Sequence, residues 1–253
     1  MPCGPTVSFH EIYLPTDYYP SLGGGGLVYV RVYWNNRALP EDPVILHAYG
    51  NADDTELIHE HLLDALESIR YHILTFDFPH SGNTRCSVLS SEHTVNATAE
   101  VVYDYLTLVM KVPSIIVWGR SIGSSVATYL ASTHPTRVSA VILQSAFTSL
   151  ARHLTYKDAP EVGDNVSLFY YLAEHHDNVG KLDVYVAKAQ HPDILLIHGD
   201  HDREIPHTHA LYLQKRFPNI ASLELIERGD HNDLSFKLCG ELIVKWLREG
   251  NNM

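Results

Sequence analysis

Hydrophobic positions along this 253-residue chain follow two alternating periods. Short runs rich in valine, isoleucine and leucine have the length of strands, and the segments between them repeat apolar residues every three or four positions. Strands are expected at 27–34, 44–47, 71–76, 114–118, 140–144, 194–198 and 223–226. Helices are expected at about 53–68, 93–110, 123–134, 208–217 and 234–249. This alternation predicts an α/β fold, with a mostly parallel twisted sheet and helices on both faces.

Two segments depart from the simple alternation. The run 27–34 alternates like an antiparallel strand, and the glycines at 23–26 before it favour a hairpin connection, because no Lys-Ser/Thr pair follows to make a phosphate cradle. The stretch 146–192 is longer than a crossover needs, so a cap or insertion is expected at about 147–192, with Phe169-Tyr170-Tyr171-Leu172 as its apolar cluster. No linker divides the chain, and one domain over 1–253 is expected.

Composition narrows the class of protein. A hydrophobic content of 45% with 19% charged residues is typical of a well-packed soluble globule. The net charge of -12 argues against nucleic acid and anionic membranes as partners, because both bind basic patches. No apolar run reaches the roughly 18 residues of a transmembrane helix, and the first residues lack the apolar core of a signal peptide. The three cysteines, Cys3, Cys86 and Cys239, are an odd number without metal-ligand spacing, which suits a reducing compartment better than a disulfide framework. We therefore expect a cytoplasmic protein.

The segment Gly119-Arg120-Ser121-Ile122-Gly123 lies between an expected strand and an expected helix. A serine at such a corner has a strained backbone, so its neighbours two positions away must be nearly free of side chain. The turn lifts the serine hydroxyl above the end of the sheet, and the helix N-terminus places the Ile122 amide where an oxyanion would form. The spacing therefore predicts Ser121 as a nucleophile.

A serine nucleophile needs a histidine base that a carboxylate orients. The strand at 194–198 leads into Gly199-Asp200-His201-Asp202, and the strand at 223–226 leads towards Gly229-Asp230-His231. The order serine, acid, histidine is that of the α/β-hydrolase sheet. His231 lies in a loop after the last strand, whereas His59, His61, His175 and His176 lie in expected helices. Spacing alone leaves Asp200 and Asp202 as competing acids.

Together these three motifs resemble the serine hydrolases grouped as α/β-hydrolase domain-containing protein 17 and its relatives, over about 27–247. The resemblance implies that the acid lies three positions after the glycine of His-Gly, which is Asp202. It also implies an oxyanion donor after the third strand, where the Asn51 amide would pair with that of Ile122.

The chain departs from that family at several positions. Tyr49 stands where the family has histidine, and His80-Ser81 stands where relatives carry a glycine and an aromatic residue. Relatives of this type anchor to membranes through an N-terminal cysteine cluster and remove palmitoyl groups from proteins. This chain has no such cluster, so a membrane-bound depalmitoylase role does not carry over.

These observations predict a serine hydrolase that cleaves carboxylic ester or thioester bonds through an acyl-enzyme, without cofactor or metal. The acyl substrate is a small molecule or is linked to a protein. One alternative is a serine peptidase of the prolyl-oligopeptidase-like class, which usually carries an additional domain. Another is a catalytically silent hydrolase fold that binds a partner. A metal hydrolase would use His198, His201, Asp202, His207 and His209, which lack a recognised ligand spacing.

Overall fold

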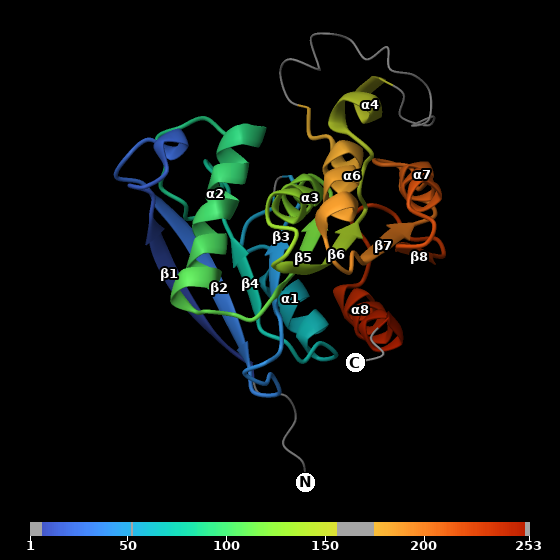
Figure 1. Cartoon of the computed structure of the whole chain (residues 1–253), viewed down its shortest axis with the longest axis horizontal. Helices are drawn as coiled ribbons and strands as arrows, with labels where there is room; N and C mark the ends of the chain where they lie inside the picture. Colours follow the sequence, from blue (N-terminus) through green and yellow to red (C-terminus); the bar gives the residue numbers. More distant parts are fainter. Residues whose placement is uncertain (1–6, 52, 156–174, 251–253) are drawn as a thin grey trace. The chain divides into compact units, whose positions relative to one another are not determined.

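The computed structural model describes residues 7–51, 53–155 and 175–250. Its strands form an eight-stranded sheet in the order β1-β2-β4-β3-β5-β6-β7-β8. The chain divides into two compact units, one of Met1–Ile116 with Ser235–Met253 and one of Val117–Leu234. The fold is α/β, as the sequence predicts (Figure 1).

The first unit contains the antiparallel edge of the sheet. Its strands are β1 (Val7–Pro15), β2 (Leu27–Asn35), β3 (Val44–Ala48) and β4 (Ile73–Phe76). β1 and β4 each pair antiparallel with β2, whereas β3 pairs parallel with β4. The segment with the glycine run connects β1 to β2, as expected. Sequence reasoning missed β1 because most of its side chains are exposed, so it lacks the apolar run that marked the other strands.

Three helices and two short helical turns complete the first unit. They are the 3₁₀ turn η1 (Pro20–Leu22), α1 (His59–Leu66), α2 (Glu92–Asp104), the π-helical turn η2 (Tyr105–Val109) and α8 (Phe236–Gly250). α2 begins at a capping box between Ser91 and Thr94. α1 and α8 approach so closely that a Cβ at Gly240 would lie 2.7 Å from the Ala65 carbonyl oxygen. Glycine at this position therefore permits the contact.

Helix α1 begins later than the sequence predicts, so the expected start at residue 53 is wrong. The Asp54 carboxylate accepts hydrogen bonds from the Glu56 and Leu57 amides, both at 2.9 Å. The Thr55 amide donates to the Asp77 carboxylate at 2.8 Å. These side-chain acceptors hold a turn in place of a first helical turn, so the helix starts only at His59.

The second unit contains the parallel half of the sheet. Its strands are β5 (Ile115–Arg120), whose first two residues belong to the other unit, β6 (Val138–Gln144), β7 (Ile194–Gly199) and β8 (Ala221–Ile226). β6 pairs with β7 and β7 with β8, both in parallel register. Its helices are α3 (Gly123–Thr133), α4 (Leu150–Thr155), α6 (Asn178–Lys188) and α7 (Thr208–Arg216). α3 and α6 lie side by side (Figure 1).

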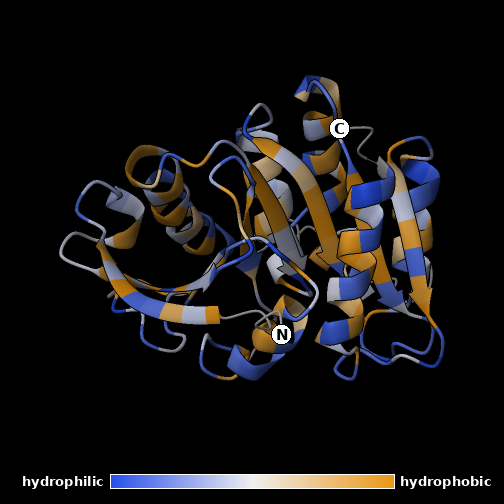
Figure 2. Cartoon of the chain, turned by 90° about the horizontal axis from the view of Figure 1, so that it is seen from below, coloured by the Kyte–Doolittle hydropathy of each residue, from blue (hydrophilic) through white to orange (hydrophobic). Residues whose placement is uncertain are grey.

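Burial follows the strand pattern. Every residue of β3, β4, β5 and β7 is buried, and Figure 2 shows hydrophobic residues concentrated on strands while the loops are mainly hydrophilic. Fully apolar strands of this kind are typical of a parallel sheet covered on both faces. Within the second unit the carboxyl ends of β5, β7 and β8 lead into the loops of Ser121, Asp202 and His231.

The insertion is described only at its ends. α4 and α6 flank residues 156–174, so the predicted apolar cluster at 169–172 lies outside the described residues. The prediction that His175 and His176 are helical is wrong, because both precede α6, whose N-cap is Asp177. That the chain forms one domain with a cap at 147–192 stays a prediction. Among the described residues, no helix has the length and apolarity needed to cross a membrane.

Candidate active site

Ser121 occupies a strained turn between β5 and α3. Its φ of +53° lies in the left-handed region, which non-glycine residues rarely adopt. A Cβ at Gly119 would lie 2.3 Å from the Gly123 carbonyl oxygen and 2.6 Å from the Ser124 Cα, so only glycine allows the helix to begin this close to the strand. The Ser121 amide donates to the Gln144 carbonyl of β6 at 2.9 Å, which holds the turn against the sheet.

The N-terminus of α3 supplies the electrophilic side of this corner. Ile122 is the N-cap residue of α3. The first amides of a helix have no intrahelical acceptor, and the helix dipole makes this end positive. The corner therefore places a serine hydroxyl next to backbone donors that suit an anion.

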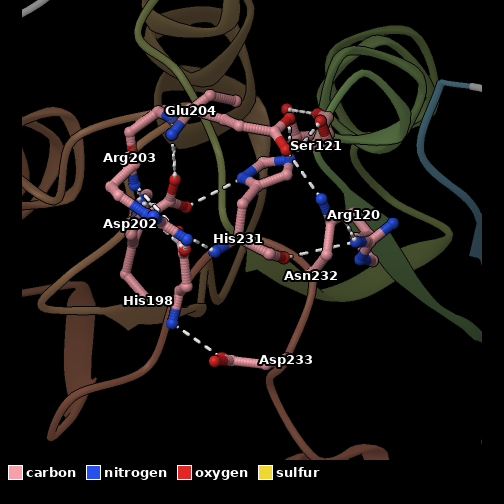
Figure 3. Close-up of polar contacts among 12 residues, drawn as sticks. Arg120, Ser121, His198, Asp202, Arg203, Glu204, His231, Asn232 and Asp233 are labelled. Atoms are coloured by element: carbon pink, nitrogen blue, oxygen red, sulfur yellow. Dashed lines mark hydrogen bonds and ion pairs between the residues drawn. The ribbon is translucent and has the colours of Figure 1, made fainter.

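His231 connects Ser121 to a carboxylate (Figure 3). Its Nε2 lies 3.0 Å from Ser121 Oγ, and its Nδ1 lies 2.8 Å from Asp202 Oδ2. A carboxylate only accepts hydrogen bonds, so Nδ1 carries the proton and Nε2 is left to accept one from the serine hydroxyl. The imidazole is buried, and the three groups form a chain of hydrogen bonds from Ser121 through His231 to Asp202.

Asp202 is held by four donors although its side chain is fully buried. Its Oδ1 accepts from the Glu204 amide at 2.9 Å and the Ile205 amide at 2.7 Å, and its Oδ2 accepts from His231 and from His198 at 3.3 Å. Burial raises the pKa of Asp202, but the hydrogen bonds from the two imidazoles outweigh it and hold the pKa well below its usual range. The carboxylate is therefore ionised in all but strongly acidic solution.

His198 is a partner of Asp202 that sequence reasoning did not place. Its Nε2 donates to the Ile205 carbonyl at 2.7 Å and faces Asp202 at the same time. Because a carbonyl oxygen can only accept a hydrogen bond, the Ile205 carbonyl fixes the tautomer of His198 that carries the proton on Nε2. His198 is the last side chain of β7, so it braces the acid loop from inside the sheet. In the sequence, His198 stood out only through the His-Gly pattern and as one of the residues considered for a metal site.

Asp200 points to a different environment from Asp202. Its carboxylate accepts from its neighbour His201 Nδ1 and from the Arg228 amide, both at 2.6 Å, and both contacts are at the surface. The hydrogen bond from His201 lowers the pKa of Asp200. The structure therefore brings Asp202 to His231, and it gives Asp200 a role in joining the loops after β7 and β8.

The loop of His231 is tied down on both sides. Arg120 Nη2 donates to the His231 carbonyl at 3.2 Å and to Asn232 Oδ1 at 2.7 Å, and Asn232 Nδ2 donates to Glu204 at 2.6 Å (Figure 3). On the other side Arg203 forms an ion pair with Asp230, whose carboxylate also accepts from the His231 amide at 2.8 Å. In the serine motif Arg120 is a variable position, and its contacts show that it positions the loop of His231.

A buried polar chain supports the serine corner from α6. Ser124 Oγ donates to the Ser121 carbonyl at 2.6 Å, and Asn178 Nδ2 donates to Ser124 Oγ at 2.9 Å. Asn178 also donates to the Phe147 carbonyl at 2.8 Å and accepts from Thr128 Oγ1 at 2.8 Å. Asn178 is fully buried, so the first residue of α6 anchors the serine turn through satisfied hydrogen bonds. No sequence motif marked this residue.

Comparison with known proteins identifies the family of this chain. Residues 43–171 match the family described as alpha/beta hydrolase fold. The chain belongs to this family. The match covers the β5 to α3 corner, so the family assignment includes the segment that carries Ser121 in this α/β-hydrolase.

Curated relatives of this α/β-hydrolase include lysophosphatidylserine lipases ABHD12. The protein from Danio rerio is 33% identical over 112 residues, 43% of this chain and 29% of that protein. The protein from Bos taurus is 32% identical, over 54% of this chain and 34% of that protein. The protein from Xenopus tropicalis is 27% identical, over 71% of this chain and 47% of that protein. The matches thus span less than half the length of these relatives. They support the superfamily and not a specific likeness to α/β-hydrolase domain-containing protein 17.

Solved structures share the fold with this α/β-hydrolase. Est1E from Butyrivibrio proteoclasticus with bound ferulic acid has a TM-score of 0.69 and 16% identity, covering 94% of this chain and 98% of that one. A soluble variant of monoglyceride lipase from Saccharomyces cerevisiae has a TM-score of 0.66 and 18% identity over 95% and 97%. S-formylglutathione hydrolase from Staphylococcus aureus has a TM-score of 0.68 and 15% identity, and the match covers 97% of this chain and 100% of that one.

The remaining predicted site residue, Asn51, lies in the first unit of the hydrolase, in an exposed turn after β3. Its pairing with Ile122 joins residues of different units and stays a prediction. Tyr49, the departure from the family pattern, is buried, and its hydroxyl donates to Asp77 at 3.3 Å and accepts from the Phe78 amide at 2.9 Å. Burial raises the pKa of Tyr49 well above its usual value, so the hydroxyl remains neutral and structural.

The second departure from the family pattern has a visible backbone consequence. His80 has a φ of +63°, in the region where glycine is favoured, which fits the glycine of the relatives. Ser81 Oγ donates to the Asp53 carbonyl at 2.9 Å and joins this loop to the turn before α1. Both substitutions therefore shape the same loop of the first unit.

The residues considered for a metal do not assemble into a site in the described part of the hydrolase. No group of three or more histidine, cysteine, aspartate or glutamate side chains there could hold a metal ion. His209 instead lies on α7 and contacts Thr148, and His201 pairs with Asp200 at the surface.

Proposed function

We propose that the chain is a serine hydrolase that cleaves carboxylic esters or thioesters through an acyl-enzyme. The observation that carries the proposal is the relay in which His231 Nε2 lies 3.0 Å from Ser121 Oγ while its Nδ1 bonds to buried Asp202. Ser121 is the nucleophile, His231 the general base and acid, and Asp202 the group that orients the imidazole. The Ile122 and Asn51 amides are the proposed oxyanion donors.

The chemistry follows two transfers. Ser121 Oγ attacks the acyl carbon while its proton passes to His231 Nε2, and the carbonyl oxygen becomes an oxyanion at the α3 N-terminus. The imidazolium then gives that proton to the leaving oxygen or sulfur, and the bond to the leaving group breaks. A water molecule, deprotonated by the same nitrogen, then attacks the acyl-serine. The bond between the acyl carbon and Ser121 Oγ breaks, the imidazolium returns the proton to that oxygen, and the carboxylic acid leaves. No cofactor or metal is needed for these steps.

The leaving group decides which bond is easiest. A thiolate, with a pKa near about 8.5, leaves with little help, whereas an alkoxide needs a proton from His231 and an amine needs it most. The named activities of the relatives and neighbours are those of a lysophosphatidylserine lipase, a monoglyceride lipase and an S-formylglutathione hydrolase. They favour oxygen esters and thioesters, with an acyl lipid as one candidate substrate. A depalmitoylase activity on proteins falls within the same chemistry.

Two alternatives use the same fold. A serine peptidase of the prolyl-oligopeptidase-like class would use the same three residues on an amide. A catalytically silent fold would use none of them, and the hydrogen bonds that join His231 to both partners count against this alternative.

The test is labelling of the purified protein by a fluorophosphonate, followed on the same sample by p-nitrophenyl esters of increasing acyl length and by matched thioesters. We expect labelling and turnover that both vanish in Ser121→Ala, because the hydroxyl is the attacking atom. Ser132→Ala, on the same helix but bonded only to the Tyr129 carbonyl, is the matched control and should label normally. A folded wild-type protein that neither labels nor turns over any ester would contradict the proposal.

A further inference from the structure

Glu204 places a carboxylate beside the nitrogen that gives up the proton. Its Oε2 lies 3.8 Å from His231 Nε2, and its side chain is 60% exposed. Hydrogen bonds hold both the backbone and the carboxylate of Glu204. Its amide donates to Asp202 at 2.9 Å, and its Oε1 accepts from Asn232 Nδ2 at 2.6 Å. The carboxylate is therefore held in place by the same loops that hold the catalytic groups.

In the described part of the chain the only ion-pair contact of Glu204 is with His231 Nε2, which is charged only when protonated, so no lysine or arginine neutralises the charge of Glu204. Its partner is the neutral amide of Asn232, and Arg120 contacts the far side of that amide through Asn232 Oδ1 at 2.7 Å. The nearby cation Arg203 is paired with Asp230. Glu204 thus presents a negative charge to solvent next to His231.

The position matters because of the direction of proton transfer. In the proposed reaction His231 Nε2 donates to the leaving atom, which must come within about 3 Å of that nitrogen. The atoms attached to the leaving oxygen or sulfur therefore pass close to the Glu204 carboxylate, whereas the acyl chain extends from the other side of the scissile bond.

We propose that Glu204 forms a leaving-group subsite that selects esters of cationic alcohols or thiols, such as alkylammonium esters, over esters of anionic ones. The inference rests on the proposed function and specifies its substrate class. An ammonium group two or three bonds from the leaving atom would lie near Glu204 and be attracted to it, while a phosphate or sulfonate there would be repelled. Such a preference would separate this enzyme from a lipase that acts on anionic glycerophospholipids.

The test compares three butyrate esters of similar shape and different charge. They are the choline ester (cationic), the 3,3-dimethylbutyl ester (neutral) and the 3-sulfopropyl ester (anionic), with acid release followed in a pH-stat. For wild type we expect kcat/KM for the cationic ester to exceed that for the neutral ester by about fivefold, and the neutral to exceed the anionic by a similar factor, as fits a partly exposed charge pair. Raising the ionic strength should reduce both ratios.

Variants of Glu204 separate its charge from its shape. Glu204→Gln keeps an oxygen for Asn232 and should bring both ratios to about one, because the charge is gone. Glu204→Lys should invert their order. Glu227→Gln is the matched control: Glu227 is an exposed carboxylate whose partner is Arg228, its loss changes the net charge equally, and the ratios should stay at wild-type values.

Two negative results have different meanings. If wild type hydrolyses the neutral ester and Ser121→Ala does not, but Glu204→Gln leaves the ratios unchanged, the subsite is wrong and the serine hydrolase stands. If wild type hydrolyses none of the three esters faster than Ser121→Ala, the proposed function fails, and the subsite fails with it.

Discussion

Asp202 and Asp77 are two buried aspartates that follow parallel strands in different units of the chain, and their surroundings differ. Asp202 accepts two backbone amides and two imidazoles, and its pKa is held far below the usual value. Asp77 accepts the Thr55 amide at 2.8 Å, the Asn83 amide at 2.6 Å and the Tyr49 hydroxyl. Burial raises the pKa of Asp77, and these neutral donors do not reverse the shift.

The difference shows what makes a buried carboxylate suited to catalysis. Backbone amides satisfy a carboxylate but hold no mobile proton, so Asp77 fastens a loop. An imidazole can become charged, and a carboxylate beside it stabilises that charge as it forms. Burial is common to both residues, and the partner decides the role.

The two aspartates should differ most in how much their replacement lowers turnover. Asp202→Asn should lower kcat by about 10⁴-fold, because an amide at this position permits the wrong tautomer of His231 and cannot stabilise the imidazolium. The measurement is steady-state hydrolysis of a p-nitrophenyl ester by the folded variant.

Asp200→Asn is the matched control for that experiment, since it makes the same chemical change two residues away. Its contacts are His201 and the Arg228 amide at the surface, so its turnover should stay within about threefold of wild type. A larger loss in Asp200→Asn than in Asp202→Asn would show that the acid is misassigned.

A smaller effect, on stability, is expected at the other carboxylate. Asp77→Asn should lower the free energy of unfolding by about 1 to 3 kcal/mol, because the new amide group faces a backbone donor that it cannot accept from. Turnover per folded molecule should change far less than in Asp202→Asn. Urea unfolding followed by circular dichroism, with activity measured on the same sample, checks both statements, and a catalytic loss without a stability loss would contradict them.

The smallest effect is a pH dependence of opposite sign at the two sites. The depressed pKa of Asp202 gives stability that is present above the unfolded pKa of about 3.9 and is lost as pH falls towards the folded value. The raised pKa of Asp77 gives stability that is present below about 3.9 and is lost as pH rises through the folded value.

Between about pH 5 and pH 3, therefore, the stability cost of Asp202→Asn should shrink as the solution becomes more acidic, and that of Asp77→Asn should grow. Urea unfolding of wild type and both variants at each pH measures these costs. Parallel trends in the two variants would show that the partners do not set the direction of the pKa shifts.

Much of the fold could be predicted because apolar periodicity is a local signal. The strands at 27–34 and 194–198 were placed to within one residue of β2 and β7, since alternating apolar residues mark the first and a short apolar run marks the second. The exposed strand β1 carries no such run and was missed. The start of α1 was misplaced because Asp77, which is distant in sequence, takes the Thr55 amide.

The α/β class and the candidates Ser121 and His231 followed from local sequence patterns. Apolar runs mark the strands, two glycines mark the corner of Ser121, and His231 lies in a loop that follows a strand. Only the tertiary structure showed Asp202 rather than Asp200 at His231, and only it revealed Arg120, His198, Asn178 and Glu204 around the site. Two aspartates two residues apart look alike in a sequence. Which one is buried against the imidazole depends on how the loops after β7 and β8 fold together, and spacing along the chain does not encode that.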